Sequence, residues 1–215
     1  MLRAVELPAE MIDDGLSGGT VRENQSKSAR ARHAAAMRGA VLDRTFYARS
    51  ALVVARQLLG KVLVRRVDER ELTAPITETE AYIGPHDLAC HASKGRTPRT
   101  EVMFGPAGCW YVYFIYGIHW MLNVVTNDVD HPAAVLIRGA GEWTGPARLT
   151  KAMAIDKRLN GAEASRSSGL WIEDRGIKIA PGAIERTPRI GVDYAGHWAD
   201  RPYRFVVNAA DLREV

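Results

Sequence analysis

The sequence contains little cysteine and no long apolar run, and each absence excludes a class of protein. Two cysteines in 215 residues cannot form the disulfide framework of a small secreted domain. No stretch approaches the roughly 18 apolar residues of a membrane-spanning helix, and acids stand where a secretory signal needs its apolar run. We therefore expect a cytoplasmic protein with no membrane partner.

Aromatic residues and surplus charge are also scarce. Lys+Arg 29 against Asp+Glu 25 leaves +4, a surplus too small to predict a polyanionic partner until the charges are placed. No aromatic residue precedes Phe46, so the N-terminal segment cannot bury enough apolar surface to offset the entropy of ordering it. We predict a disordered or weakly ordered tail over residues 1–43 and one domain over residues 44–215. The basic stretch 27–38 is interpreted as solvated or locally helical, with contact to a phosphate backbone as the alternative.

The remaining sequence shows helical and strand periodicities that do not alternate regularly. Apolar residues at helical spacing, among them Val53, predict a helix from residue 50 to Gly60. Runs of β-branched and aromatic residues predict strands, two of which meet near Gly117. The pattern favours an α+β fold: a single mixed domain with a curved, largely antiparallel sheet flanked by helices and a protruding β-hairpin. Further strands are expected over 62–64, 76–83, 134–139, 170–174 and 203–208, and a second helix over 147–155.

The densest cluster of side chains that can take part in chemistry lies in the segment ITETEAYIGPHDLACH, residues 76–91. Side chains alternate along a strand, so Glu78, Glu80 and Tyr82 share one face. Glu80 lies where the run turns apolar, and burial would raise its pKa and suit it to proton abstraction. Glu78 taken alone is interpreted as part of a solvent-exposed polar face.

The same segment offers a metal-binding alternative. His86, Asp87 and His91 carry groups that ligate metals. Their spacing, however, matches no helix pair or loop typical of a metal site. The sequence therefore predicts that there is no metal site, and a metal-dependent hydrolase of small molecules is left as a lesser hypothesis.

A second cluster joins basic and aromatic residues. Arg96 and Arg99 precede a predicted strand that carries Tyr111, Tyr113 and Tyr116. Cations that neutralise phosphates, followed by rings that stack on bases, are typical of proteins that handle an extruded nucleotide. The alternative is that these rings only fill the core. Tyr116 is expected at the turn, where it would be exposed as a wedge.

Six blocks follow one another along the sequence: ETEAYIGPHDLACH, TPRTEVMFGPAG, YVYFIYGIHWMLN, AVLIRG, GPARLTKAMAI and RIGVDYAGHWADRPYRF. Taken in this order, they resemble the blocks of the alkyladenine, or 3-methyladenine/methylpurine, DNA glycosylase family. The likeness extends over about residues 46–208.

The resemblance implies a monofunctional, metal-free and cofactor-free enzyme that flips damaged purines, alkylated or deaminated, out of duplex DNA. A Glu-activated water would then hydrolyse the N-glycosidic bond and leave an abasic site. The implied partner is double-stranded DNA, and the implied form is a nucleoid-associated monomer.

The resemblance also implies roles for individual residues. Glu80 would be the general base that activates water, and Arg138 would help to position the water and the carboxylate. A backbone carbonyl near Ile190 would contact the same water. The flipped base would be enclosed by aromatic rings, with Asn123 against the purine edge, and Tyr116 would fill the gap left in the duplex. The implied rings are Tyr82, His91 and Tyr113, and the other implied DNA contacts are Ile118, His119, Arg96, Arg99 and Arg148.

Physical reasoning agrees with these roles. Extruding a base costs a few kcal/mol of stacking, which an inserted Tyr116 would partly offset. A cationic alkylated purine is attracted to the faces of Tyr82 and Tyr113. The rival hypothesis is a non-catalytic minor-groove binder that uses the Tyr116 hairpin alone. Glu80 and Arg138 argue against it, because a wedge needs no buried base.

Overall fold

The computed structural model describes residues 39–213 of the chain. Most of the predicted tail, residues 1–38, lies outside the described residues. Gly39 onward belongs to the second of two units of the chain, and strand β1 (Ala40–Val41) pairs with β7 (Leu170–Asp174). Part of the predicted tail therefore forms a strand within the described residues, because two residues with no aromatic side chain still pair with a strand distant in the sequence.

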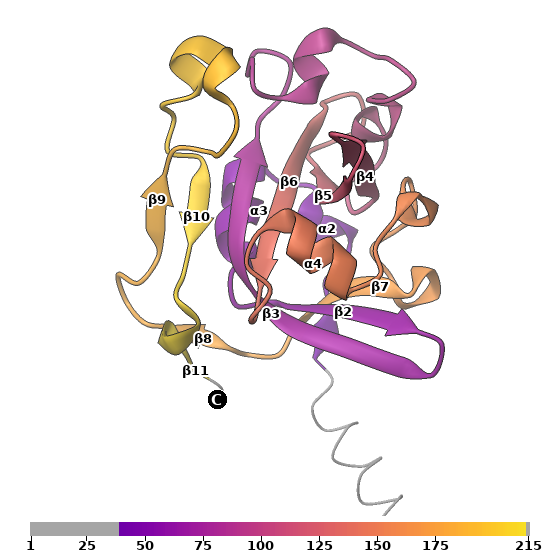
Figure 1. Cartoon of the computed structure of the whole chain (residues 1–215), viewed down its shortest axis with the longest axis vertical. Coiled ribbons are helices and arrows are strands. Elements are labelled where there is room, and N and C mark those ends of the chain that lie inside the picture. The colour runs from indigo at the N-terminus through magenta and orange to yellow at the C-terminus, as the bar shows by residue number, and fades with distance from the viewer. Residues whose placement is uncertain (1–38, 214–215) are drawn as a thin grey trace, which may run out of the picture. The chain divides into compact units, whose positions relative to one another are not determined.

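Strand β3 (Arg70–Tyr82) is the axis of the sheet. Its first half pairs with β2 (Val62–Val67). Its second half pairs with β6 (Ala133–Ala140) along one edge and with β10 (Arg204–Val206) along the other. Figure 1 shows β3 running between β10 and β6. One long strand thus brings together segments that lie far apart in the chain.

The other strands extend the sheet on both sides of β3, and every pairing in it is antiparallel. A separate two-stranded sheet joins β8 (Lys178–Ile179) to β11 (Leu212–Arg213). The expected α+β class and the curled antiparallel sheet are confirmed. The remaining members of the large sheet are β4 (Trp110–Ile115), β5 (His119–Thr126) and β9 (Glu185–Thr187).

Helices cover the sheet, among them α2 (Arg44–Tyr47), α3 (Ala51–Leu58) and α4 (Pro146–Ala152). The buried residues of α3 are spaced at i, i+3, i+4 and i+7, as a helix on a core requires. The predicted apolar stripe included Val53, which is instead 42% exposed because it lies off that face. None of the helices in residues 39–213 is long and apolar enough to span a membrane.

The alternation of side chains gives the sheet two different faces. One face is aliphatic and packs in the main core with α3; its members include Ala81, Leu122, Val124, Val135 and Ile137. The other face carries aromatic and polar groups that line a cavity; its members include Tyr82, Tyr111, Tyr113, Asn123 and Arg138. The period of two that predicted the strands therefore also separates the core from the candidate site.

Two irregularities interrupt the pairing of β3 with β6. Ile76 pairs with Ala140 and Glu78 with Gly139, whereas Thr79 pairs with Ile137. Each step leaves one residue unpaired, Thr77 on β3 and then Arg138 on β6. A β-bulge bends its strand and turns side chains in new directions. Here the bulges bring Arg138 beside the carboxylates of β3.

Candidate active site

A cavity of about 380 Å³, here called the pocket, lies over the aromatic and polar face of the sheet. Its walls come from β3 to β6 and from two loops, one after β3 and one after β9. The volume falls within the range typical of small-molecule sites, which are mostly apolar with a few placed polar groups. The lining residues used below are Tyr82, His91, Tyr111, Tyr113, Tyr116, His119, Asn123, Arg138, Ile190 and Tyr194.

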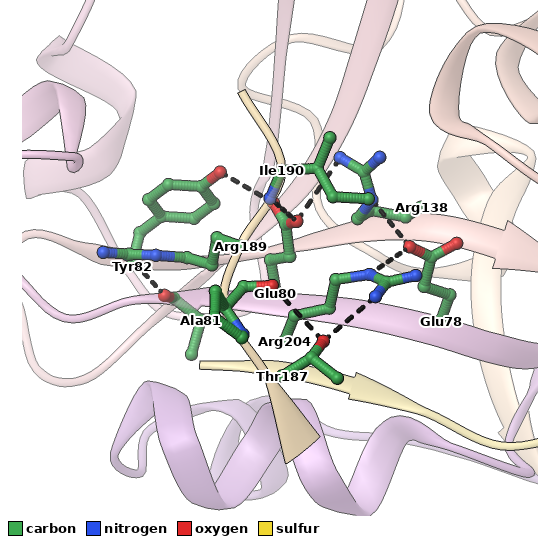
Figure 2. Close-up of polar contacts among 10 residues, drawn as sticks. Glu78, Glu80, Ala81, Tyr82, Arg138, Thr187, Arg189, Ile190 and Arg204 are labelled. Atoms are coloured by element: carbon green, nitrogen blue, oxygen red, sulfur yellow. Dashed lines mark hydrogen bonds and ion pairs between the residues drawn. The ribbon is translucent and has the colours of Figure 1, made fainter. Parts of the chain in front are cut away.

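Glu80 lies beneath the floor of the pocket and is 0% exposed. Three groups converge on its carboxylate (Figure 2). The Tyr82 hydroxyl donates to Oε2 at 2.8 Å, and the Ile190 N–H donates to Oε1 at 2.8 Å. Arg138 Nη1 lies 3.4 Å from the same Oε1. Tyr82, Ile190 and Arg138 all line the pocket, so the groups that contact the Glu80 carboxylate form part of the pocket wall.

The environment of Glu80 acts on its pKa in two directions. Burial raises the pKa most, whereas the charge of Arg138, the Ile190 N–H and the Tyr82 hydroxyl lower it, and the nearby Glu78 raises it again. The net direction is upward. A carboxylate whose pKa lies above the ordinary value is a stronger base toward water, which suits it to accept a proton.

Glu78 is paired inside the protein, and the expectation of a solvent-exposed face is wrong for it. Its side chain is 12% exposed, and its Oε1 accepts from Arg138 Nε at 2.8 Å and from Arg204 Nε at 2.6 Å. Arg204 also donates to the Thr187 hydroxyl at 3.0 Å. The physical reason is tertiary: β10 brings Arg204 beside β3 and a bulge turns Arg138, and neither is visible in the local sequence.

Asp87 and Arg189 form a buried ion pair that the sequence did not predict. Both side chains are fully buried, and two hydrogen bonds of 2.6 and 2.8 Å join them. Arg189 also donates to the Ala81 carbonyl at 2.9 Å, and its guanidinium lies 4.8 Å from the centre of the Tyr82 ring. The pair ties the loop that carries Ile190 to β3. Asp87, a candidate metal ligand from the sequence, is therefore held by Arg189.

Aromatic side chains form the walls of the pocket. The ring centroids of His91 and Tyr113 lie 4.6 Å apart, and those of Tyr111 and Tyr113 lie 5.0 Å apart. His91 Nδ1 lies 2.8 Å from the Tyr111 hydroxyl. Burial, aided by the charge of Arg99, lowers the pKa of His91 to about 4, so its ring is neutral at pH 7. The structure thus brings His91 against two rings that lie 20 or more residues later in the sequence.

Asn123 and Ile190 also line the pocket, and each makes a hydrogen bond in which one partner is a backbone group. Asn123 is buried, and its side-chain amide donates to the Tyr111 carbonyl at 3.1 Å. The Ile190 N–H donates to the Glu80 carboxylate at 2.8 Å. The contact expected between a backbone carbonyl near Ile190 and water stays a prediction.

The hairpin between β4 and β5 ends in an exposed tyrosine at the mouth of the pocket. Tyr116 is 85% exposed. Its φ of 51° and the 70° of Gly117 are the combination of a type I′ turn, closed by the Ile118 N–H to the Ile115 carbonyl at 3.1 Å. Tyr116 and His119 both line the pocket, and Ile118 is exposed. The sequence correctly placed Tyr116 at the turn.

The predicted phosphate-binding arginines have different surroundings. Arg96 forms ion pairs with Glu101 at 2.8 Å and with Asp130 at 2.9 Å, so two acids compensate its charge. Arg99 lies 5.0 Å from the centre of the Tyr113 ring, at the edge of the pocket. Arg148 is exposed on α4, beside pocket-lining residues. Within the described residues no ion pair compensates Arg99 or Arg148, and phosphate contact by any of the three arginines stays a prediction.

Fold and site together define a protein with an aromatic pocket above a buried, hydrogen-bonded carboxylate. A family model for methylpurine-DNA glycosylases matches residues 45–143 and 141–211. Three relatives have names that include the words 3-methyladenine DNA glycosylase. The protein from Myxococcus xanthus is 50% identical over 175 residues, which are 77% of this chain and 89% of the relative. Those from Methanocella arvoryzae and Legionella pneumophila (strain Corby) are 48% and 46% identical, over 77% of this chain and over 91% and 93% of the relatives.

The chain therefore belongs to the methylpurine-DNA glycosylase family. The resemblance that the six sequence blocks indicated is confirmed. Membership supports the expectation of a DNA glycosylase, a hydrolase that acts on DNA. The roles of the individual site residues stay predictions and are taken up next.

Proposed function

We propose that this protein excises damaged purines from duplex DNA by hydrolysing the N-glycosidic bond, with Glu80 as the base that activates water. The observation that carries the proposal is Glu80 itself, enclosed beneath an aromatic pocket with Arg138 and the Ile190 N–H on one oxygen. The names of the relatives point to methylated adenine as one substrate.

The geometry of Glu80 supports a role toward water. Among the described residues only Tyr82 donates to Oε2, so this oxygen keeps a lone pair for a water molecule. Glu80 accepts a proton as the water oxygen attacks the anomeric carbon, and the electron pair of the glycosidic bond leaves with the purine. Positive charge that builds on the sugar is stabilised by the carboxylate. Because Glu80 is enclosed in this state, one of the three lining groups has to shift before water reaches it.

The pocket and the hairpin support base flipping. A base within a duplex conceals its glycosidic bond, so the nucleotide has to leave the stack. The rings of Tyr82 and Tyr113 and the neutral ring of His91 offer faces on which a flipped purine stacks. Tyr116, exposed at the mouth, fills the vacated space. No lysine in residues 39–213 lines the pocket, which supports hydrolysis over Schiff-base chemistry.

The test replaces Glu80 with an uncharged isostere. Glu80→Gln is expected to bind duplexes that contain one lesion each with unchanged affinity, while single-turnover excision falls about 10²–10⁴-fold. Undiminished excision would contradict the assigned role. Loss of excision in the wild type on addition of a chelator would support the metal-dependent alternative. The absence of base release from every lesion duplex would favour the non-catalytic minor-groove binder.

A further inference from the structure

Glu78 is the acid near the pocket floor that the proposed reaction does not use. It shares a strand face with Glu80, and Figure 2 shows it on the far side of Arg138. Arg138 spans the two carboxylates, with its Nε 2.8 Å from Glu78 Oε1 and its Nη1 3.4 Å from Glu80 Oε1. The shorter contact is made with Glu78. The orientation of Arg138 is therefore determined mainly by the acid that is remote from the pocket.

The fold is shaped to admit this second carboxylate. A Cβ added at Gly139, the partner of Glu78 on β6, would lie 3.3 Å from Glu78 Cβ and 3.5 Å from its Oε2. The contact with Glu78 Cβ is tighter than usual, so a larger residue at this position would press on the Glu78 side chain. The bulge at Arg138 lies directly beside Gly139. Two backbone features, a bulge and a glycine, thus place Arg138 and Glu78 together.

The charges of the cluster balance. Two carboxylates, Glu78 and Glu80, meet two guanidiniums, Arg138 and Arg204. Of the two carboxylates, Arg204 forms an ion pair only with Glu78, whereas Arg138 forms ion pairs with both. Removal of either outer member would therefore change the charge that Glu80 senses, without removing any group that contacts Glu80.

We propose that Glu78 is a positioning residue: held between Arg204 and Arg138, it directs Arg138 at Glu80 and limits how much of that positive charge Glu80 receives. This inference rests on the proposed role of Glu80 as the base. Full pairing with Arg138 would make Glu80 a weaker base. Partial pairing with Arg138 leaves Glu80 basic and still holds its carboxylate in place.

Other charged or titratable groups also face Glu80. Tyr82 lies on its own strand and Arg138 on β6. Tyr113 on β4 and Arg189 in the loop after β9 both interact with it electrostatically. Arg204 on β10 is its cross-strand partner. A test has to leave these groups in place and change only the charge around Glu78.

The experiment compares Glu78→Gln with Arg204→Gln through the pH dependence of single-turnover excision. Glu78→Gln removes the anion and leaves Arg138 to Glu80 alone, so the acidic limb of the profile is expected about one pH unit lower. Arg204→Gln leaves Glu78 without its outer partner, so the limb is expected to move to higher pH. A matched control is Asp156→Asn, which alters an exposed pair on another part of the surface.

The outcomes separate this inference from the proposed function. Opposite displacements of the acidic limb in the two variants support Glu78 as a positioning residue. Displacements in the same direction, or profiles that superimpose on the wild type, overturn it, even where both variants lose rate. If Glu80→Gln excises at the wild-type rate, the proposed function itself fails. Urea denaturation of both variants ensures that the profiles come from folded protein.

Discussion

The floor and the mouth of the pocket differ in almost every physical respect. Glu80, beneath the floor, and Asp87, in the loop after β3, are fully buried, and each has charged or hydrogen-bonding partners at 2.6 to 3.4 Å. At the mouth, Tyr116 and Tyr194 are 85% and 70% exposed. Buried charges with many partners hold a geometry, whereas exposed rings are free to contact another molecule. The contrast separates a buried, closely hydrogen-bonded region from an exposed aromatic surface.

The contrast has an energetic consequence. Removing one member of a buried ion pair costs about 3–5 kcal/mol, because the other charge is left uncompensated. An exposed pair contributes about 0–1 kcal/mol. Removing one partner of a buried ion pair should therefore lower the stability of the fold, whereas changes at the exposed mouth should alter excision alone. The following experiments test this division.

The largest effect is expected at the buried pair of Asp87 and Arg189. Asp87→Asn should lower the free energy of unfolding by about 3–5 kcal/mol, because Arg189 keeps its charge in a buried site. Urea denaturation measures the loss. The matched control is Asp156→Asn, whose partner Arg158 is exposed, and its expected cost is about 1 kcal/mol or less. Equal losses in the two variants would show that the buried pair contributes no more to the free energy of unfolding than the exposed pair.

A smaller effect, confined to excision, is expected at Tyr116. Tyr116→Ala removes the ring that offsets part of the few kcal/mol of unstacking, so single-turnover excision should fall about 10- to 100-fold. The free energy of unfolding should change by about 0.5 kcal/mol or less, because the side chain is exposed. Val129→Ala, at an exposed apolar residue outside the pocket lining, is the control. Unchanged excision by Tyr116→Ala would remove the wedge from the mechanism.

The smallest effect concerns His91 in the wall between floor and mouth. Its folded pKa of about 4 lies below the ordinary 6.5, so the unfolded chain binds a proton more readily. Stability supplied by neutral His91 is therefore lost as pH falls from about 6.5 to about 4. His91→Gln should weaken this dependence, as measured by unfolding at pH 7 and pH 5. The exposed His131→Gln should keep it. If His91→Gln lost as much stability between pH 7 and pH 5 as the wild type does, His91 would not be the source of the pH dependence.

Local sequence patterns predicted the parts of the structure that depend on local physics. Alternation along β3 placed Glu80 and Tyr82 on one face, and the Tyr-Gly pair placed Tyr116 at a turn. Both follow from backbone geometry within a few residues. The family resemblance then supplied roles that spacing alone could not give, such as that of Arg138.

Contacts between distant segments were beyond the reach of such patterns. Asp87 and Arg189 are 102 residues apart, and no periodicity links them. Glu78 was interpreted as exposed because its two arginine partners arrive through a bulge and through a strand near the C-terminal end. Asp130, one of the two acids paired with Arg96, is 34 residues away and becomes its neighbour only in the folded chain. Pairing partners of charged residues are tertiary information.

The backbone conformation of Tyr116 lowers the stability of the hairpin turn. A residue other than glycine at a φ of 51° is uncommon, and Asn or Asp adopts this conformation more readily than a bulky ring does. Asn followed by Gly would be expected to make a more stable turn at the same place. The tip of the hairpin therefore sacrifices some folding stability to present an aromatic side chain, as is typical where activity and stability favour different residues.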